Sequence, residues 1–167
     1  MGTGWMATER TVVLIRHGKS DWSGDEADID RPLAARGRRQ ARESGRWLAA
    51  HTEPIELAVV SPARRAQGTW EVVAAELRHP PPVRIDERVY AAAGRTLAAV
   101  VRGLPEGLAT VALVGHNPAV EQLAAILTGE WVAMPTSTVA VITWPGPWSA
   151  AGESSAVLRA SGRPPQE

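Results

Sequence analysis

Three short apolar runs constrain the fold of this chain more than any other feature. Residues 12–15, 55–61 and 109–115 are rich in valine, leucine, isoleucine and alanine. Runs of this length without regular polar alternation are typical of strands buried on both faces of a parallel sheet. Segments rich in alanine, leucine and arginine separate the runs and have helical spacing. The alternation of strands and helices therefore predicts an α/β fold.

The remaining segments complete this pattern. Helices are predicted over residues 34–50, from Pro62 to about 78, over 96–102 and over 119–127, with Gly129 closing the last. Further strands are predicted at an edge (83–85), as an alternating run (137–144) and as its hairpin partner (154–161). The predicted fold class is an α/β, three-layer α/β/α sandwich with a mostly parallel central sheet.

The length of 167 residues suits one domain. Residues 1–10 lack an apolar pattern, and we expect them to be a disordered lead-in. A single domain is predicted over residues 11–161. The polar segment 162–167 is expected to be a frayed tail.

Composition excludes several classes of partner. Lysine plus arginine and aspartate plus glutamate both number 18, so no basic excess favours nucleic acid or anionic membranes. The absence of cysteine excludes disulfides and thiolate catalysis. No apolar run reaches the length of a membrane span, and the first residues lack a secretory signal's apolar stretch. We expect a cytoplasmic protein with no nucleic-acid or membrane partner.

The oligomeric state is left open by the sequence. Trp131, Trp144 and Trp148 are interpreted as exposed side chains, which belong either to an interface between subunits or to ordinary surface.

Residues that suit phosphate chemistry follow three of the predicted strands: Arg16-His17-Gly18, Ser61-Pro62 with Arg64 and Arg65, and Gly115-His116-Asn117. In open α/β sheets, ligands bind beyond the carboxyl ends of the strands. Arginine presents a planar fork of donors to phosphate oxygens, and neutral histidine is a competent nucleophile. No acidic cluster accompanies these residues, so the pattern indicates phosphoryl chemistry without a metal or another cofactor.

Structural roles compete with these functional ones. A single histidine at a strand end is more often a hydrogen-bonded structural residue than a nucleophile. His51, at a helix end, and His79, in a proline-rich connection, are interpreted in this way. The arginines between residues 36 and 46 are typical of a solvated helix face.

Five sequence blocks together resemble the histidine phosphatase superfamily, which has the phosphoglycerate mutase-like fold. The segment LIRHGKSDW carries the Arg-His-Gly signature, and four blocks follow in the family's order: DRPLAARGRRQA (30–41), SPARRAQGTW (61–70), DERVY (86–90) and VGHNP (114–118). The short chain and the wording of the first two blocks are most similar to the SixA-like phosphohistidine phosphatases. His116 is followed by asparagine rather than by the aspartate or alanine-glutamate of phytase-like members.

The resemblance implies catalytic roles for individual residues. His17 would be the nucleophile that becomes phosphorylated, and Arg16 and Arg65 would hold the phosphoryl oxygens. Arg65, rather than Arg64, occupies the family's arginine in the serine-proline motif. His116, in its cationic form, would complete the pocket and favour the charge that develops in transfer.

A proton donor and further substrate contacts follow from the same resemblance. Glu87, in the DERVY block, would be the general acid and base, with Asp21 and Asp86 as alternatives. Arg31, Ser23 and Asn117 would contact the substrate, although Ser23 stands where relatives often have asparagine.

The predicted activity is that of a metal-independent phosphatase with a phosphohistidine intermediate on His17. A backbone carbonyl close to Gly18 is expected to accept the proton on the other ring nitrogen. The predicted substrate is a phosphohistidine-bearing protein. A small phosphomonoester, such as a sugar phosphate or nucleotide, is the alternative, and a non-catalytic phosphate-binding module is a second one.

Overall fold

The computed structural model describes residues 9–153 and 156–166. Its strands are β1 (Glu9–Arg16), β2 (Leu57–Val60), β3 (Val83–Ile85), β4 (Thr110–Gly115), β5 (Val139–Pro145), β6 (Val157–Gly162) and β7 (Pro165–Gln166). Its α-helices are α1 (Ala35–His51), α2 (Arg64–Ala74), α3 (Gly94–Arg102) and α4 (Ala119–Thr128). The strands form one sheet in the order β3-β2-β4-β1-β5-β6-β7.

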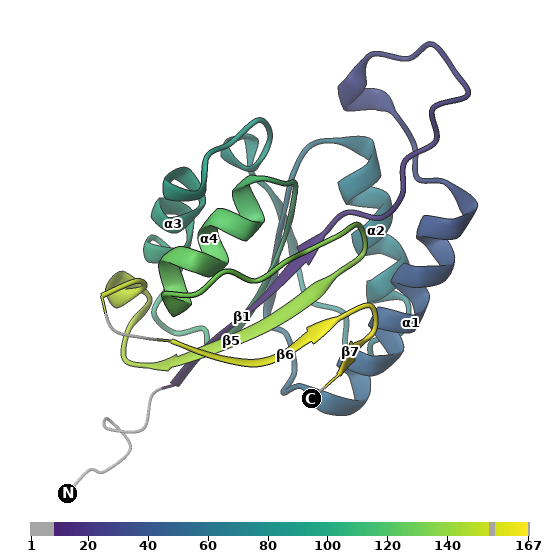
Figure 1. Ribbon diagram of the computed structural model, residues 1–167. Coiled ribbons are helices and arrows are strands. Elements are labelled where there is room, and N and C mark those ends of the chain that lie inside the picture. The colour runs from purple at the N-terminus through teal and green to yellow at the C-terminus, as the bar shows by residue number, and fades with distance from the viewer. Residues whose placement is uncertain (1–8, 154–155, 167) are drawn as a thin grey trace, which may run out of the picture.

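Two pairs of helices cover the two faces of this sheet. Helices α1 and α2 lie on one face and α3 and α4 on the other (Figure 1). Strand β1 contributes side chains to the hydrophobic core on each face of the sheet. Val12 and Leu14 pack toward α3 and α4, whereas Val13 and Ile15 pack toward α1 and α2. The predicted three-layer α/β/α sandwich is confirmed.

Parallel pairing places the ends of three strands at one edge. Strands β3, β2, β4 and β1 pair in parallel, whereas β5, β6 and β7 add antiparallel strands beyond β1. Arg16 lies opposite Gly115, and Val60 lies opposite Val114. The residues that follow β1, β4 and β2 therefore leave the sheet at nearly the same level.

The two ends of the described chain differ from the prediction. Strand β1 begins at Glu9, within the expected lead-in, and Arg10 is buried and donates to a carboxylate oxygen of Glu106. Residues 1–8 lie outside the described residues. The expected frayed tail is wrong for residues 162–166, because Gly162 belongs to β6 and β7 pairs back onto it; residue 167 lies outside the described residues.

Two tryptophans expected at the surface are buried. Trp144 and Trp148 are 2% and 0% exposed, and their rings meet edge to face at 5.5 Å. The turn after β5 brings the two side chains together, which strand alternation alone does not predict. Of the three tryptophans, Trp131 is exposed as expected, at 67%.

Two helix boundaries shift from their predicted positions. Helix α2 ends at Ala74 rather than near residue 78. The amides of Glu76 and Leu77 bond to carbonyls three residues back, which tightens the chain before the prolines at 80–82. Helix α3 begins at Gly94, where a Cβ would overlap the side chain of Gln122 on α4. No helix in the described part of the chain is long and apolar enough to cross a bilayer.

Candidate active site

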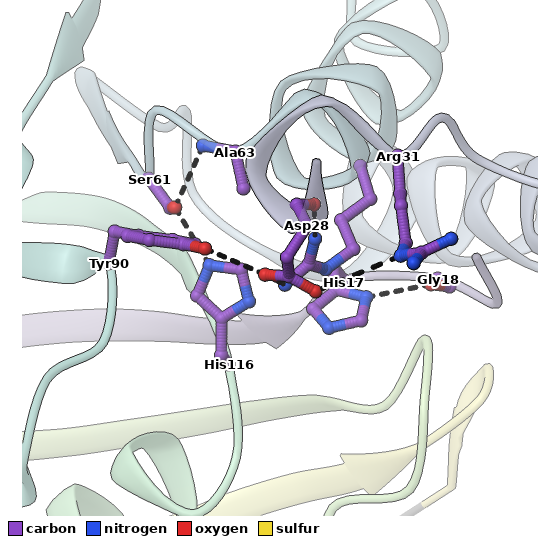
Figure 2. A network of polar contacts seen from close by, with 9 residues as sticks. His17, Gly18, Asp28, Arg31, Ser61, Ala63, Tyr90 and His116 are labelled. Atoms are coloured by element: carbon purple, nitrogen blue, oxygen red, sulfur yellow. Dashed lines mark hydrogen bonds and ion pairs between the residues drawn. The ribbon is translucent and has the colours of Figure 1, made fainter. Parts of the chain in front are cut away.

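Two histidines lie side by side at the carboxyl edge of the sheet. His17 follows β1 and His116 follows β4, and their ring centroids are 4.9 Å apart. The backbone amide of His17 donates to the carbonyl of Gly115 at 3.0 Å, so the pairing of the strands continues to the site. Figure 2 shows the two imidazoles with Asp28 and Tyr90 beside them.

His17 has one ring nitrogen engaged and the other free to react. Its Nδ1 lies 2.7 Å from the carbonyl oxygen of Gly18, which fixes the proton on Nδ1 and leaves a lone pair on Nε2. The prediction of a carbonyl close to Gly18 is confirmed. Burial, helped by the charges of Arg65 and Arg16, lowers the pKa of His17 to about 4. The imidazole is therefore neutral near pH 7, as nucleophilic attack requires.

His116 differs from the expectation in its charge. Burial, followed by the neighbouring His17 and Arg65, lowers its pKa to about 3. The free site therefore holds His116 as a neutral imidazole, because two guanidinium groups and a second imidazole disfavour another cation. Its Nε2 lies 2.7 Å from Ser61 Oγ, and its Nδ1 is buried with no hydrogen-bond partner in residues 9–153 and 156–166.

Arg16 approaches the site from the end of β1. Its Nη1 donates to the carbonyl of Met134 at 3.1 Å, and its Nε is buried without a hydrogen-bond partner among the described residues. Burial lowers the pKa of Arg16, an effect that the carboxylate of Glu121 opposes. The guanidinium remains charged, since its ordinary pKa is far above neutrality.

Arg65 lies in the first turn of α2, and its neighbour Arg64 is exposed to solvent. Thr69 connects this helix to the nucleophile's loop, because its Oγ1 accepts from the amide of Gly18 at 2.9 Å and donates to the carbonyl of Arg65 at 2.7 Å. This link holds the Arg65 backbone at a set position relative to His17.

Asp28 is a site residue that the sequence analysis missed. Its carboxylate accepts from Arg65 Nη2 at 3.0 Å and from the hydroxyl of Tyr90 at 2.7 Å, and its carbonyl accepts from Arg65 Nη1 at 2.6 Å. The hydrogen bond from Tyr90, followed by those from Arg65, holds the pKa of Asp28 below its usual range. The tyrosine ring also meets His116 edge-on, with centroids 5.6 Å apart.

Little in the sequence points to either new residue. Asp28 is one of several acids in the loop between Ser20 and Arg31, which has no periodicity to single out one position. Tyr90 ends the DERVY block and is the only tyrosine of the chain, which is the one signal that could have drawn attention to it.

The three predicted substrate contacts have different surroundings. Arg31 reaches the site through Asp28, with Nε 4.0 Å from Oδ1, and its guanidinium lies 3.8 Å from the ring centroid of Trp22. Asn117 Nδ2 donates to the carbonyl of Met134, which also accepts from Arg16 Nη1. Ser23 is exposed and donates to the carboxylate of Asp21 at 2.6 Å, and no contact joins it to the histidines among the described residues.

The candidate proton donors are not equivalent. Hydrogen bonds from Ser23 lower the pKa of Asp21, and those from Arg88 lower the pKa of Asp86. Both carboxyl groups are therefore anionic near neutrality and are poor acids. Glu87 is exposed, and its side chain makes no hydrogen bond or ion pair with any other described residue.

Four of the eleven buried side-chain polar atoms that lack a hydrogen-bond partner among the described residues belong to predicted site residues. They are Arg16 Nε, Arg31 Nε, His116 Nδ1 and Asn117 Oδ1. A buried polar group left without a hydrogen bond costs about 1–3 kcal/mol, so a ligand that bonds to these atoms would gain from satisfying them. Two of the four atoms are guanidinium donors, which suit an oxyanion. Residues 9–153 and 156–166 contain no group of three or more histidine, aspartate or glutamate side chains that could hold a metal ion.

Comparison with known proteins places the chain in a family. Residues 12–90 match the model of the histidine phosphatase superfamily, branch 1. The chain belongs to the histidine phosphatase superfamily. The uncharacterized protein Rv1276c of Mycobacterium tuberculosis is 34% identical over 146 residues, which are 81% of this chain and 90% of that protein. An uncharacterized protein of Mycobacterium leprae is 32% identical over 80% of this chain and 89% of its own length.

Solved structures support the SixA-like branch. This histidine phosphatase superposes on a phosphohistidine phosphatase SixA from Nakamurella multipartitia with a TM-score of 0.85 and 26% identity, over 93% of this chain and 96% of that one. The protein histidine phosphatase SixA in complex with tungstate gives a TM-score of 0.81 and 27% identity, over 92% and 97%. The predicted resemblance and the assignment to the phosphatases, a class of hydrolases, are confirmed.

Proposed function

We propose that this histidine phosphatase removes phosphoryl groups from phosphohistidine side chains of proteins, without a metal, through an intermediate on His17. The observation that carries this proposal is the state of His17, whose neutral ring has Nδ1 bonded to the Gly18 carbonyl and Nε2 free. The Nε donors of Arg16 and Arg31 support it, because they have no hydrogen-bond partner within the described part of the chain and suit the oxygens of a phosphoryl group.

In the first step, His17 Nε2 attacks phosphorus as the bond from phosphorus to the substrate nitrogen breaks on the opposite side. The substrate, protonated on its other ring nitrogen, leaves as a neutral imidazole. Negative charge on the equatorial oxygens is stabilised by Arg16 and Arg65, whose positions are set before the substrate arrives. Asn117 and Arg31 are proposed as further contacts to the substrate. Catalysis then depends on positioning and on electrostatics more than on proton transfer.

In the second step, a water oxygen attacks phosphorus as the bond to His17 Nε2 breaks. Inorganic phosphate leaves, and His17 returns to its neutral form with the proton still on Nδ1. Glu87 is proposed to take the proton of the attacking water.

Two of the three candidate proton donors, Asp21 and Asp86, are poorly suited to an alkyl phosphate. An alkoxide leaving group needs a strong proton donor, but Asp21 and Asp86 are held in their anionic forms. An imidazole leaving group needs less protonation than an alkoxide does. The similarity to the two SixA structures supports the same substrate class.

Two alternatives remain as outcomes of the test. The chain shares its fold with a mycobacterial glucosyl-3-phosphoglycerate phosphatase, at a TM-score of 0.59 and 21% identity, so a small phosphomonoester is the second candidate substrate. A phosphate-binding module without activity is the third reading, and the free Nε2 of His17 opposes it. The cytoplasmic location stays a prediction of the sequence.

The deciding experiment measures phosphate release by the purified protein. The substrates are a phosphohistidine-bearing phosphocarrier protein, p-nitrophenyl phosphate, sugar phosphates and nucleotides. We expect the phosphohistidine protein to be preferred and His17→Asn to abolish turnover, whereas His79→Asn, at an exposed position, serves as the matched control. Preference for a small monoester would replace the proposed substrate, and equal turnover by His17→Asn would end the proposed mechanism.

A further inference from the structure

Ser61 is buried beside His116 and has no role in the steps above. It follows β2 and is 0% exposed. Its Oγ lies 2.7 Å from His116 Nε2 and accepts a hydrogen bond from the backbone amide of Ala63 at 3.1 Å (Figure 2). Its own amide donates to the carbonyl of Val114, two residues before His116, which holds the two segments together.

The hydrogen atoms of the Ser61 hydroxyl and the His116 imidazole limit how these two groups can bond to each other. A neutral imidazole has one N–H and one lone pair, whereas a serine hydroxyl has one donor and two acceptor positions. Ala63 occupies one acceptor position of Ser61. The remaining contact, to His116 Nε2, has two arrangements, which differ in the nitrogen that carries the imidazole proton.

In the first arrangement, Nε2 carries the proton and donates to Ser61. The serine hydroxyl proton then has no other acceptor among the described residues, and Nδ1 presents a lone pair. In the second, the proton is on Nδ1 and Ser61 donates to Nε2. The serine hydroxyl proton is then bonded to Nε2, and Nδ1–H is a buried donor to which the described residues offer no acceptor.

A bound phosphoryl group distinguishes the two arrangements. Its oxygens are acceptors, so an Nδ1–H attracts them, whereas an Nδ1 lone pair repels them. The charged and titratable groups around His116 are His17, Arg65, Asp28, Arg16 and the edge-on Tyr90. Burial, His17, Arg65 and Arg16 lower the pKa of the ring, Asp28 opposes them, and the ring of the free site is neutral. A neutral ring donates to the phosphoryl group only when its single proton is on the nitrogen that faces the group.

We infer that Ser61 is a positioning residue, which holds neutral His116 in the tautomer with its proton on Nδ1 so that the ring donates to the phosphoryl group. This inference rests on the proposed phosphate site, although its main test does not require turnover. The same short segment carries Ser61 and Arg65, so it would set both the tautomer of His116 and the position of the arginine.

The first experiment reads the tautomer directly by nitrogen NMR of protein with ¹⁵N-labelled histidine, saturated with inorganic phosphate. The two nitrogens of a neutral imidazole differ widely in chemical shift according to which one is protonated. His116→Asn assigns the signals of His116. We expect a protonated Nδ1 and a bare Nε2 on His116. A proton on Nε2 in this complex would overturn the inference.

Variants of Ser61 supply the second readout. Ser61→Ala removes the donor to Nε2, so we expect a mixture of His116 tautomers and a decrease in kcat on the order of 10-fold, with little change in KM. Ser61→Thr keeps a hydroxyl and should restore the Nδ1–H tautomer and most of the lost kcat. The signals of His17, which is held by Gly18, should not change in either variant.

The outcomes separate this inference from the proposed function. An unchanged tautomer in Ser61→Ala would show that Ser61 does not control it, whatever the substrate is. Failure of the protein to hydrolyse any phosphorylated substrate would overturn the proposed function and leave the nitrogen signals as an independent test of the phosphate-bound state. The wild-type spectrum tests the inference even where a variant does not fold.

Discussion

Acid should destabilise this protein through the two active-site histidines. An unfolded histidine has a pKa of 6.5, whereas burial in the folded protein lowers the pKa of His17 to about 4 and that of His116 to about 3. At a pH between the folded and the unfolded pKa, these two histidines bind protons in the unfolded chain but not in the folded chain. The stability that the two neutral histidines contribute is therefore fully present above about pH 6.5. It is lost as the pH falls toward the pKa values of these histidines in the folded protein.

The size of the effect follows from these pKa values. Lowering the pH from about 8 to about 5 should decrease the free energy of unfolding by about 2 kcal/mol for each histidine. Both together give about 4 kcal/mol, which for a chain of this length corresponds to a decrease in Tm of roughly 8–16 °C. Asp28, Asp21 and Asp86 do not contribute in this range, because their pKa values are lowered from 3.8.

The assay is urea unfolding followed by circular dichroism, at several pH values between about 5 and 8. His17→Asn and His116→Asn should each remove about 2 kcal/mol of the pH dependence, and the double variant about 4 kcal/mol. His79→Asn controls for the loss of an exposed histidine and should leave the dependence unchanged. The same dependence in wild type and in the double variant would refute the neutral state of both rings, and with it the explanation of His17 as a nucleophile.

Three further predictions concern the phosphate site. Arg65→Ala should decrease kcat/KM by about 10²-fold or more, as the loss of one transition-state donor does elsewhere, and steady-state rates equal to wild type would contradict its placement. Asp28→Asn removes a negative charge beside Arg65, so inorganic phosphate should inhibit with a several-fold lower Ki, and an unchanged Ki would separate Asp28 from the anion. EDTA should leave the rate unchanged, and metal-reversible inhibition would mean that a metal takes part.

The sequence by itself determined the parallel strands of the sheet. It also determined that Arg16, His17, Arg65 and His116 lie at the carboxyl edge of these strands. Buried strands are recognisable from short apolar runs, and parallel pairing brings their carboxyl ends together whatever the loops do. His17 and His116 each follow such a run directly. Arg65 follows the run of β2 after one short turn. Their proximity therefore follows from local pattern and topology, and the family blocks add their roles.

Other features depended on contacts between segments distant in sequence. Asp28 reaches Arg65 and Tyr90 from a loop without periodicity, so nothing local distinguishes it from the acids around it. Trp144 and Trp148 are buried because a turn folds them against each other.

The charge of His116 was also decided only by the tertiary structure. The family resemblance implied a cationic His116, which would favour the charge that develops in transfer. A pKa depends on burial and on every neighbouring charge, and those quantities exist only once β1, β4 and α2 have come together. The same assembly places the hydroxyl of Ser61 against Nε2 and leaves Nδ1 buried with no hydrogen-bond partner among the described residues.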